Sequence, residues 1–224
     1  MPFRDRLDAG RKLAAALKGF AGQDPVVLAL PRGGVPVAAE VAAQLHAPLD
    51  LVIVRKIGAP MQPELAMGAV VDGGAPIIVR NEDVIRQAMI SEVDFNRICE
   101  LELAEIASRR RRYLGERLPI EVKGRIVIVV DDGIATGATT KAALRATRMR
   151  KPKKLVLAVP VAASDSLSKS KREADKVICL EDYEYLGAIG LYYSDFSQTS
   201  DEEVVEALAR FPPAAKPDKK GAVS

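Results

Sequence analysis

Apolar residues are arranged along the chain as short continuous runs separated by stretches with helical spacing. Short apolar runs rich in branched side chains are typical of strands covered on both faces of a sheet. The runs occupy residues 26–30, 51–54, 126–130, 155–159 and 176–180. Helical spacing is present in residues 33–45 and 139–149, and a shorter helix is expected between the last two strands. Strands that alternate with helices predict an α/β fold with a doubly wound, mostly parallel five-stranded sheet.

The interval between the second and third strands carries different signals. Two short apolar stretches flank Asp72-Gly73-Gly74, which predicts a hairpin inserted at this point. Asn81 has the residue type of a helix N-cap, and a long helix is expected from about residue 82 to residue 113.

The two ends of the chain add further expectations. Ser200 and Glu203 form the pattern of a capping box, which predicts a final helix ending near Arg210. Residues 1–211 are expected to form a single domain, and the Pro-, Lys- and Ala-rich residues 212–224 a disordered tail. The N-terminus lacks the apolar core of a signal peptide, and no apolar stretch reaches the roughly 18 residues of a membrane span. A cytoplasmic protein with no membrane partner is therefore expected.

The third predicted strand runs into two carboxylates and a turn rich in glycine and threonine. The segment from Asp131 to Thr140 reads Asp-Asp-Gly-Ile-Ala-Thr-Gly-Ala-Thr-Thr. Small residues at a helix N-terminus leave backbone N–H groups open to an anion such as phosphate. A nucleotide P-loop is excluded, because Gly137 is followed by Ala138 and Lys141 comes too late. Two acids beside a phosphate cradle indicate a sugar phosphate ligand, and the competing interpretation is a tight turn with two solvated acids.

The first predicted strand ends in a second glycine-rich loop, Pro31-Arg32-Gly33-Gly34. Its glycines permit close approach of backbone to a ligand, and Arg32 offers a forked donor for phosphate oxygens. Taken alone, this segment would be an ordinary turn between a strand and a helix. In a sheet of strand order 2-1-3-4-5, however, a ligand crevice lies between the carboxyl ends of the first and third strands. The two loops are therefore expected to face each other across one phosphorylated ligand.

Together these motifs resemble the type I phosphoribosyltransferases, which use phosphoribosyl pyrophosphate (PRPP). The resemblance covers about residues 26–196. It is strongest to a bacterial phosphoribosyltransferase-like group whose members show Pro-Arg-Gly-Gly, Arg-Lys-Ile-Gly, Asp-Asp-Gly-Ile-Ala-Thr-Gly-Ala-Thr and Asp-Phe-Ser-Gln. The resemblance implies the family fold, with a small hood near residues 181–200 and a pyrophosphate loop that often contains a non-proline cis peptide. It also implies a homodimer, and it places the hairpin and long helix where the family has a mobile loop over the substrate.

The resemblance implies a role for each motif. Asp131 and Asp132 would hold the ribose hydroxyls, and Mg²⁺ indirectly through PRPP and water. The 5-phosphate would be held by the turn and the start of its helix, namely Ala135, Thr136, Gly137, Ala138 and Thr139. The pyrophosphate would be held by Arg32, Gly33, Arg55 and Lys56. Catalysis by Arg32, Lys56, Asp131 and Asp132 would be mainly electrostatic, with Arg32, Lys56 and Mg²⁺ stabilising the leaving pyrophosphate while a nitrogen acceptor attacks the sugar.

Two departures from the family pattern bear on the acceptor. Ala135 stands where enzymes for 6-oxopurines carry an aspartate, so hypoxanthine and guanine are not expected as substrates. Gly133 stands where the family has an apolar residue, which predicts a looser turn. Aromatic side chains near the last strand suit a hood that stacks on a flat base, and ordinary packing is the alternative for each. These hood candidates are Tyr185, Tyr192, Tyr193 and Phe196, and Glu64 is a further polar candidate elsewhere in the site.

The remaining charged and reactive residues favour no separate chemistry. A net charge of +3 is too small to indicate nucleic-acid binding, although basic residues cluster at 109–112 and 141–154. The competing function is a PRPP-sensing regulator that binds RNA or DNA through these clusters. No helix-turn-helix or winged-helix pattern is visible, which weighs against DNA. Cys99 and Cys179 lack metal or disulfide spacing, and His46 is expected at the surface.

Overall fold

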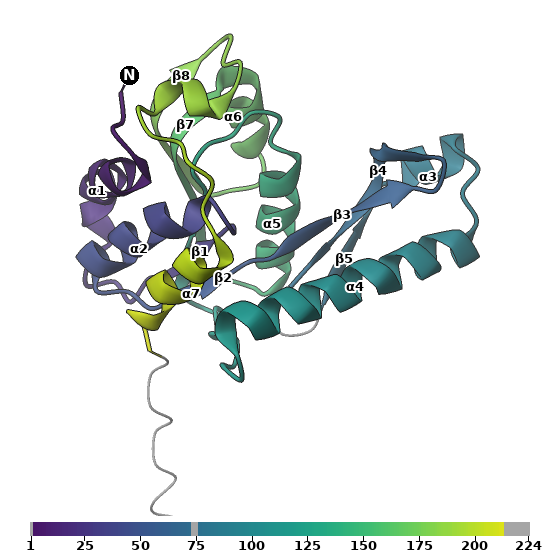
Figure 1. The fold of residues 1–224 in the computed structure, drawn as a ribbon, viewed down its shortest axis with the longest axis horizontal. Helices are drawn as coiled ribbons and strands as arrows, with labels where there is room; N and C mark the ends of the chain where they lie inside the picture. The colour runs from purple at the N-terminus through teal and green to yellow at the C-terminus, as the bar shows by residue number, and fades with distance from the viewer. Residues whose placement is uncertain (1, 73–75, 213–224) are drawn as a thin grey trace, which may run out of the picture.

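A five-stranded parallel sheet forms the centre of the molecule in the computed structural model, which describes residues 2–72 and 76–212 (Figure 1). Its strand order is β2-β1-β6-β7-β8, with all neighbouring pairs parallel. The strands are β1 (Val26–Ala29), β2 (Leu49–Leu51), β6 (Ile126–Val130), β7 (Lys154–Ala163) and β8 (Lys176–Tyr183). This confirms the predicted fold class and the 2-1-3-4-5 order.

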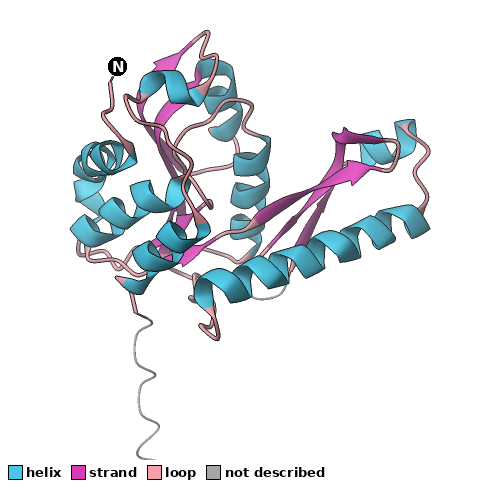
Figure 2. Cartoon of the chain, in the orientation of Figure 1, coloured by secondary structure: helices cyan, strands magenta, loops and turns pink. Residues whose placement is uncertain are grey.

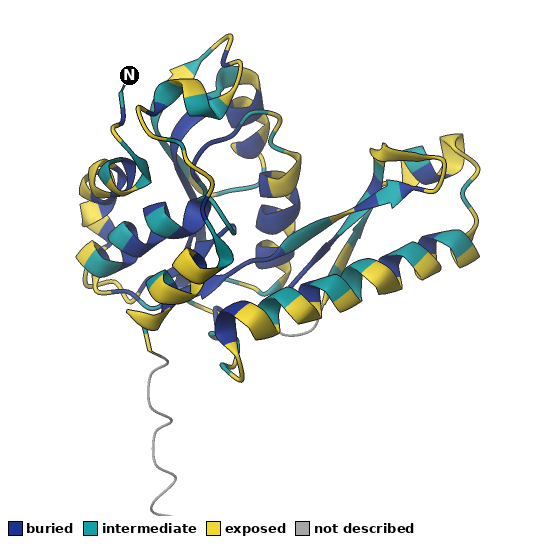
Figure 3. Ribbon diagram, in the orientation of Figure 1, coloured by how far each residue is buried: buried dark blue, intermediate teal, exposed yellow. Residues whose placement is uncertain are grey.

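Helices cover both faces of this sheet, and its strands are largely buried between them (Figure 3). Alternate residues of β1 and β6 belong to the hydrophobic clusters on opposite sides of the sheet. One face packs against α1 (Arg6–Leu17), α2 (Gly34–Leu45) and α7 (Asp201–Ala209), and the other against α5 (Ala138–Met149) and α6 (Ser164–Ser170). Helix α1 continues into the short 3-10 helix η1 (Lys18–Phe20), and Asp5 caps its start. Helix α1 was not among the elements predicted from the sequence, and its apolar residues Leu13 and Leu17 are fully buried.

A second, antiparallel sheet projects from the body as an arm (Figure 2). It contains β3 (Val54–Ala59), β4 (Gln62–Val71) and β5 (Ile77–Arg80), and is flanked by α3 (Glu82–Gln87) and α4 (Glu92–Leu114). The predicted hairpin is confirmed as β4–β5, although residues 73–75 of its turn lie outside the described part of the chain. The prediction of one strand over residues 51–54 is wrong, because the parallel strand ends at Leu51 and Val54 begins the arm.

The prediction of one long helix over residues 82–113 is also wrong. Asn81 caps α3 as expected, by accepting a hydrogen bond from the Val84 N–H. The chain then leaves helical geometry, with a positive φ of 50° at Met89. Ser91 starts α4 by accepting a hydrogen bond from the Asp94 N–H. A second cap therefore divides the expected helix in two.

The C-terminal part of the fold follows its sequence signals. The capping box of Ser200 and Glu203 is present at the start of α7, as predicted. The predicted disordered tail falls almost wholly on residues 213–224, which lie outside the described residues. Among the helices that are described, none is long and apolar enough to cross a membrane.

Candidate functional site

The two glycine-rich loops meet at the carboxyl ends of β1 and β6, as the strand order requires. The Leu30 N–H donates to the Val130 carbonyl at 2.9 Å, which joins the two strand ends. A Cβ atom on Gly33 would lie 2.1 Å from Oδ2 of Asp132, and one on Gly34 would lie 2.9 Å from Cα of Asp131. Glycine is thus required for this close approach. The peptide bond between Pro31 and Arg32 is cis, the feature that the family resemblance implied for this loop.

The turn after β6 is anchored to the sheet on one side and exposed on the other. Ile134 bridges to β7, donating its N–H to Val161 O and accepting from Ala163 N, both at 2.9 Å. The Ser166 hydroxyl donates to the Ala135 carbonyl at 2.6 Å. Gly137 has a φ of 75°, a conformation that favours glycine, and directly precedes α5.

The exposed residues of this turn are the ones predicted to hold the 5-phosphate. Thr136, Ala138 and Thr139 are exposed, and Ala135 and Gly137 are half-buried. Their backbone leads into the N-terminus of α5, where free N–H groups and the helix dipole favour an anion.

The paired acids lie beside this turn, and Arg6 of α1 contacts one of them. Its Nε lies 2.8 Å from Oδ2 of Asp132, and its Nη1 donates to the Ser197 carbonyl at 2.7 Å. The Arg6 guanidinium also stacks over the Phe196 ring, 3.9 Å from the ring centre. Arg6 could not be predicted from the sequence, because a lone arginine at the start of an unpredicted helix carries no motif.

The electrostatics of the acid pair leave room for a cation. Burial and the neighbouring Asp132 raise the pKa of Asp131 well above its usual value. Burial also raises the pKa of Asp132, an effect that Arg6 partly offsets. Among the described residues, Arg6 is the cation in ion-pair contact with this pair, so ionisation of both acids would leave one negative charge for a further cation to neutralise. Carboxylate oxygens are the ligands that Mg²⁺ prefers, usually together with water and substrate phosphates. The residues present therefore fit an indirectly held Mg²⁺.

The three basic side chains that were predicted to bind pyrophosphate point in different directions. The Nη1 of Arg32 lies 3.5 Å from an Asp201 carboxylate oxygen at the start of α7. Arg55 is directed to α4, where its Nε donates to Glu102 at 2.7 Å. Lys56 lies on the opposite face of β3 and pairs with Glu64 at 3.0 Å. The structure thus brings Arg32 and Lys56 to the borders of the site, whereas Arg55 holds α4 against the arm.

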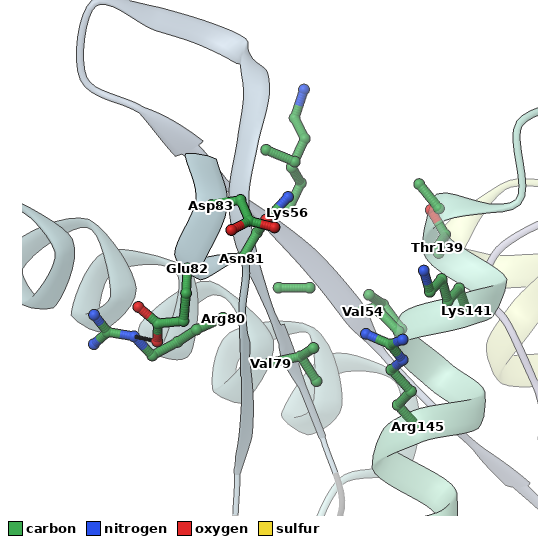
Figure 4. A pocket seen from close by; sticks show the side chains of 15 residues that line it. Val54, Lys56, Val79, Arg80, Asn81, Glu82, Asp83, Thr139, Lys141 and Arg145 are labelled. Carbon is green, nitrogen blue, oxygen red and sulfur yellow. Dashed lines mark hydrogen bonds and ion pairs between the residues drawn. The ribbon is translucent and has the colours of Figure 1, made fainter. Parts of the chain in front are cut away.

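A groove of about 430 Å³ connects Lys56 with the 5-phosphate turn. Figure 4 shows Lys56 on the arm and Thr139, Lys141 and Arg145 along α5, on facing walls of this groove. Val54 and Val79 contribute an apolar floor. The groove places the arm beside the N-terminus of α5.

The aromatic residues near β8 are largely committed to packing. Tyr193 is buried, with ring centres 5.3 Å from Phe3 and 4.9 Å from Phe196, and its hydroxyl donates to the Asp132 carbonyl at 2.6 Å. Tyr192 lies 4.4 Å from Tyr183, also between ring centres. Tyr185 is 88% exposed. Of the four hood candidates, Tyr185 therefore presents the most free ring surface.

Gly133 creates space that the hood fills. A Cβ atom at Gly133 would lie 2.7 Å from the Cγ2 methyl of Ile189, in the 3-10 helix η2 (Ile189–Tyr192). The turn is therefore packed against the hood at Gly133, in contrast to the looser turn that was expected.

Some of the basic residues in the two runs form ion pairs within the described part of the chain. In the first run, Arg109, Arg110 and Arg112 contact Glu105, Asp72 and Asp201. In the second, Arg145 and Arg148 contact Glu173 and Asp175. These pairs reduce the positive charge that an RNA surface would need. Both cysteines are free thiols, as expected, and His46 ends α2 in a left-handed conformation.

Known proteins are similar to this chain along most of its length. The family model described as a phosphoribosyl transferase domain matches residues 4–194. Proteins of Mycobacterium tuberculosis strains H37Rv and CDC 1551, both named "putative phosphoribosyl transferase", are 46% identical over 208 residues, which are 93% of this chain and 46% of each relative. The chain thus spans about half the length of these curated relatives. The crystal structure of TT1426 from Thermus thermophilus is 41% identical, with a TM-score of 0.83 and coverage of 94% of this chain and 99% of that one.

Proposed function

The chain belongs to the phosphoribosyl transferase domain family, and from this premise we propose that it transfers the 5-phosphoribosyl group of PRPP to a nitrogen acceptor with release of pyrophosphate. The observation that carries this proposal is the meeting of two glycine-rich loops beside a pair of acids at the end of β6. One loop offers helix N–H groups to a phosphate, and the other offers Arg32 to a second phosphate group.

The residues divide the ligand between them. Asp131 and Asp132 accept hydrogen bonds from the ribose hydroxyls, while the backbone of residues 135–139 and the hydroxyls of Thr136 and Thr139 bind the 5-phosphate. Arg32, Gly33 and Lys56 bind the pyrophosphate. Arg6 supports the site from α1, because its ion pair at 2.8 Å fixes the Asp132 carboxylate. Positive charge from Arg32 and Lys56 then stabilises the leaving group as the bond to the sugar breaks.

Mg²⁺ would be held through PRPP and water beside Asp131 and Asp132, and its charge would assist departure of the pyrophosphate. Closure of the groove between the arm and α5 would exclude water from the reactive sugar. We therefore expect PRPP binding to require Mg²⁺.

The acceptor is proposed to be a nucleobase other than a 6-oxopurine. Ala135 has no side-chain group that could accept a proton from such a base, and its carbonyl is already bonded to Ser166. Because Tyr192 and Tyr193 pack against other aromatic rings, the exposed ring of Tyr185 is the best remaining hood residue for stacking. A homodimer is proposed from the family resemblance, and light scattering of the purified protein would test it.

The central test is calorimetric titration of PRPP in the presence of Mg²⁺. The double variant Asp131→Asn with Asp132→Asn should bind PRPP at least about a hundredfold more weakly, because it loses two charged acceptors in a buried site. Unchanged affinity would contradict the site assignment. Pyrophosphate release measured with a panel of bases should then identify the acceptor. Release with hypoxanthine or guanine would overturn the proposed specificity.

The alternative of a PRPP-sensing RNA-binding regulator is less well supported, because five arginines of the two basic runs, Arg109, Arg110, Arg112, Arg145 and Arg148, already form intramolecular ion pairs. No pyrophosphate release with any acceptor, together with RNA binding that weakens steeply with salt, would favour that alternative.

A further inference from the structure

A polar pocket lies beside the pyrophosphate loop, on the side where Arg32 points. It measures about 380 Å³ and is bordered by Pro31 and Arg32, one face of α4, and Asp201. Two arginines of α4, Arg109 and Arg112, line it together with Arg32. Three guanidinium groups from two separate segments thus border one pocket.

The Asp201 carboxylate occupies this pocket in the manner of a bound anion. Its Oδ1 accepts a hydrogen bond from the Tyr113 hydroxyl at 2.6 Å, and its Oδ2 accepts one from a guanidinium N–H of Arg112. The Nη1 of Arg32 lies 3.5 Å from Oδ1. The hydrogen bond from Tyr113 and the nearby Arg112 lower the pKa of Asp201, so the group is a carboxylate at neutral pH. Burial and this contact raise the pKa of Tyr113 to about 12, so its hydroxyl remains a donor.

The charges around the pocket do not cancel. Two carboxylates, Glu105 and Asp201, face the three arginines, so one positive charge remains. Glu105 is paired with Arg109 at 2.7 Å along the same helix. If the Asp201 side chain moved out of the pocket, Arg32 and Arg112 would be free to bind an incoming anion. The net charge of the groups that line the pocket would then rise to +2. Guanidinium groups bind phosphate oxygens in a forked geometry, which suits an anion with several phosphate oxygens.

We propose that this pocket binds an anion of the inorganic pyrophosphate class, and that Asp201 is an internal counter-ion which the anion displaces. The inference rests on the proposed function, to which it adds Arg109 and Arg112 as pyrophosphate-binding residues. It also links the arm to the reaction, because these two arginines belong to α4. Arg32 belongs to the pyrophosphate loop and lines this pocket, so it would link the pocket to the site of the leaving pyrophosphate.

The test is calorimetric titration of inorganic pyrophosphate without divalent cations. Arg112→Gln should weaken binding about tenfold, because it removes one charged donor to phosphate. Arg111→Gln is the matched control, since Arg111 is an exposed neighbour that does not line the pocket. Asp201→Asn should strengthen binding by about threefold to tenfold by removing the competing charge. Glu202→Gln, which removes the same charge one residue away, should leave the affinity within about twofold of the wild-type value.

The outcomes separate this inference from the proposed function. No pyrophosphate binding by the wild-type protein, equal binding by Arg112→Gln, or weaker binding by Asp201→Asn would overturn the pocket. The double variant of Asp131 and Asp132 should retain pyrophosphate binding while losing PRPP. A wild-type protein that binds pyrophosphate in this pocket but not PRPP would contradict the proposed function and leave the pocket standing.

Discussion

At the scale of single residues, the site depends on the absence of a Cβ atom at Gly33. Gly33 packs so closely on Asp132 that a Cβ atom would lie 2.1 Å from a carboxylate oxygen. We predict that Gly33→Ala displaces the Asp132 side chain and lowers the free energy of unfolding by about 1–3 kcal/mol, as overpacking does in tight contacts. PRPP affinity should fall by at least about tenfold, because both loops must move apart. Urea unfolding and PRPP calorimetry measure the two effects.

The matched control for this prediction is Gly19→Ala. A Cβ atom at Gly19 would have no heavy atom within 4 Å, so unfolding free energy should stay within about 0.5 kcal/mol of the wild-type value. Equal PRPP affinity for Gly33→Ala and wild type would show that the two loops do not act as one site.

Residues in local motifs were predictable, whereas residues that reach the site from distant segments were not. Asp131, Gly137 and the surrounding turn follow a strand directly, so their position results from adjacent sequence. Arg6 contacts Asp132 across a separation of 126 residues, and no periodicity marks such a pair. Arg55 matched the family motif, yet strand alternation turns its side chain to Glu102 and away from the groove that Lys56 lines. The face of the sheet to which a strand residue points cannot be predicted before the register of that strand is known.

At the scale of elements, the arm depends on a helix that starts anew at Ser91. The Ser91 hydroxyl caps α4 by accepting from the Asp94 N–H at 3.1 Å. We predict that Ser91→Ala lowers unfolding free energy by about 1 kcal/mol through loss of this cap. Hydrogen exchange should quicken in the first turn of α4. Ser168→Ala on the exposed face of α6 provides the control and should not destabilise the protein. An unfolding curve for Ser91→Ala that matches the control would show that α4 is held by packing alone.

The parallel sheet was predictable and the arm was predictable only in part, for a physical reason. The strands β1 and β6 are buried throughout, so their apolar runs are continuous and distinct. The strand β4 begins with Gln62, Pro63 and Glu64, which are exposed and resemble a loop in sequence. Its pairing with β3 gives it a defined structure, and such tertiary pairing overrides local preference.

At the scale of the whole molecule, the N-terminal segment is joined to the hood beside the acids. Phe3 donates its N–H to Tyr192 O at 3.2 Å and accepts from Ser194 N at 2.9 Å. Its ring packs on Tyr193, whose hydroxyl holds the Asp132 carbonyl. The N-terminal segment, the hood and the acid turn therefore form one connected unit, even though they lie far apart in the sequence.

This connection predicts a long-range effect of Phe3→Ala. Phe3 is 2% exposed, so its truncation should cost about 3–5 kcal/mol of unfolding free energy. Because the ring supports Tyr193, amide hydrogen exchange should also accelerate in residues 189–196 and in the turn after β6, whereas the arm should exchange at its wild-type rate. Leu7→Ala is the control, since Leu7 is 40% exposed at the start of α1. Uniform acceleration of exchange over the whole chain would mean that Phe3 contributes only to global stability. Faster exchange confined to the hood and the acid turn would establish that the N-terminal segment supports the site locally.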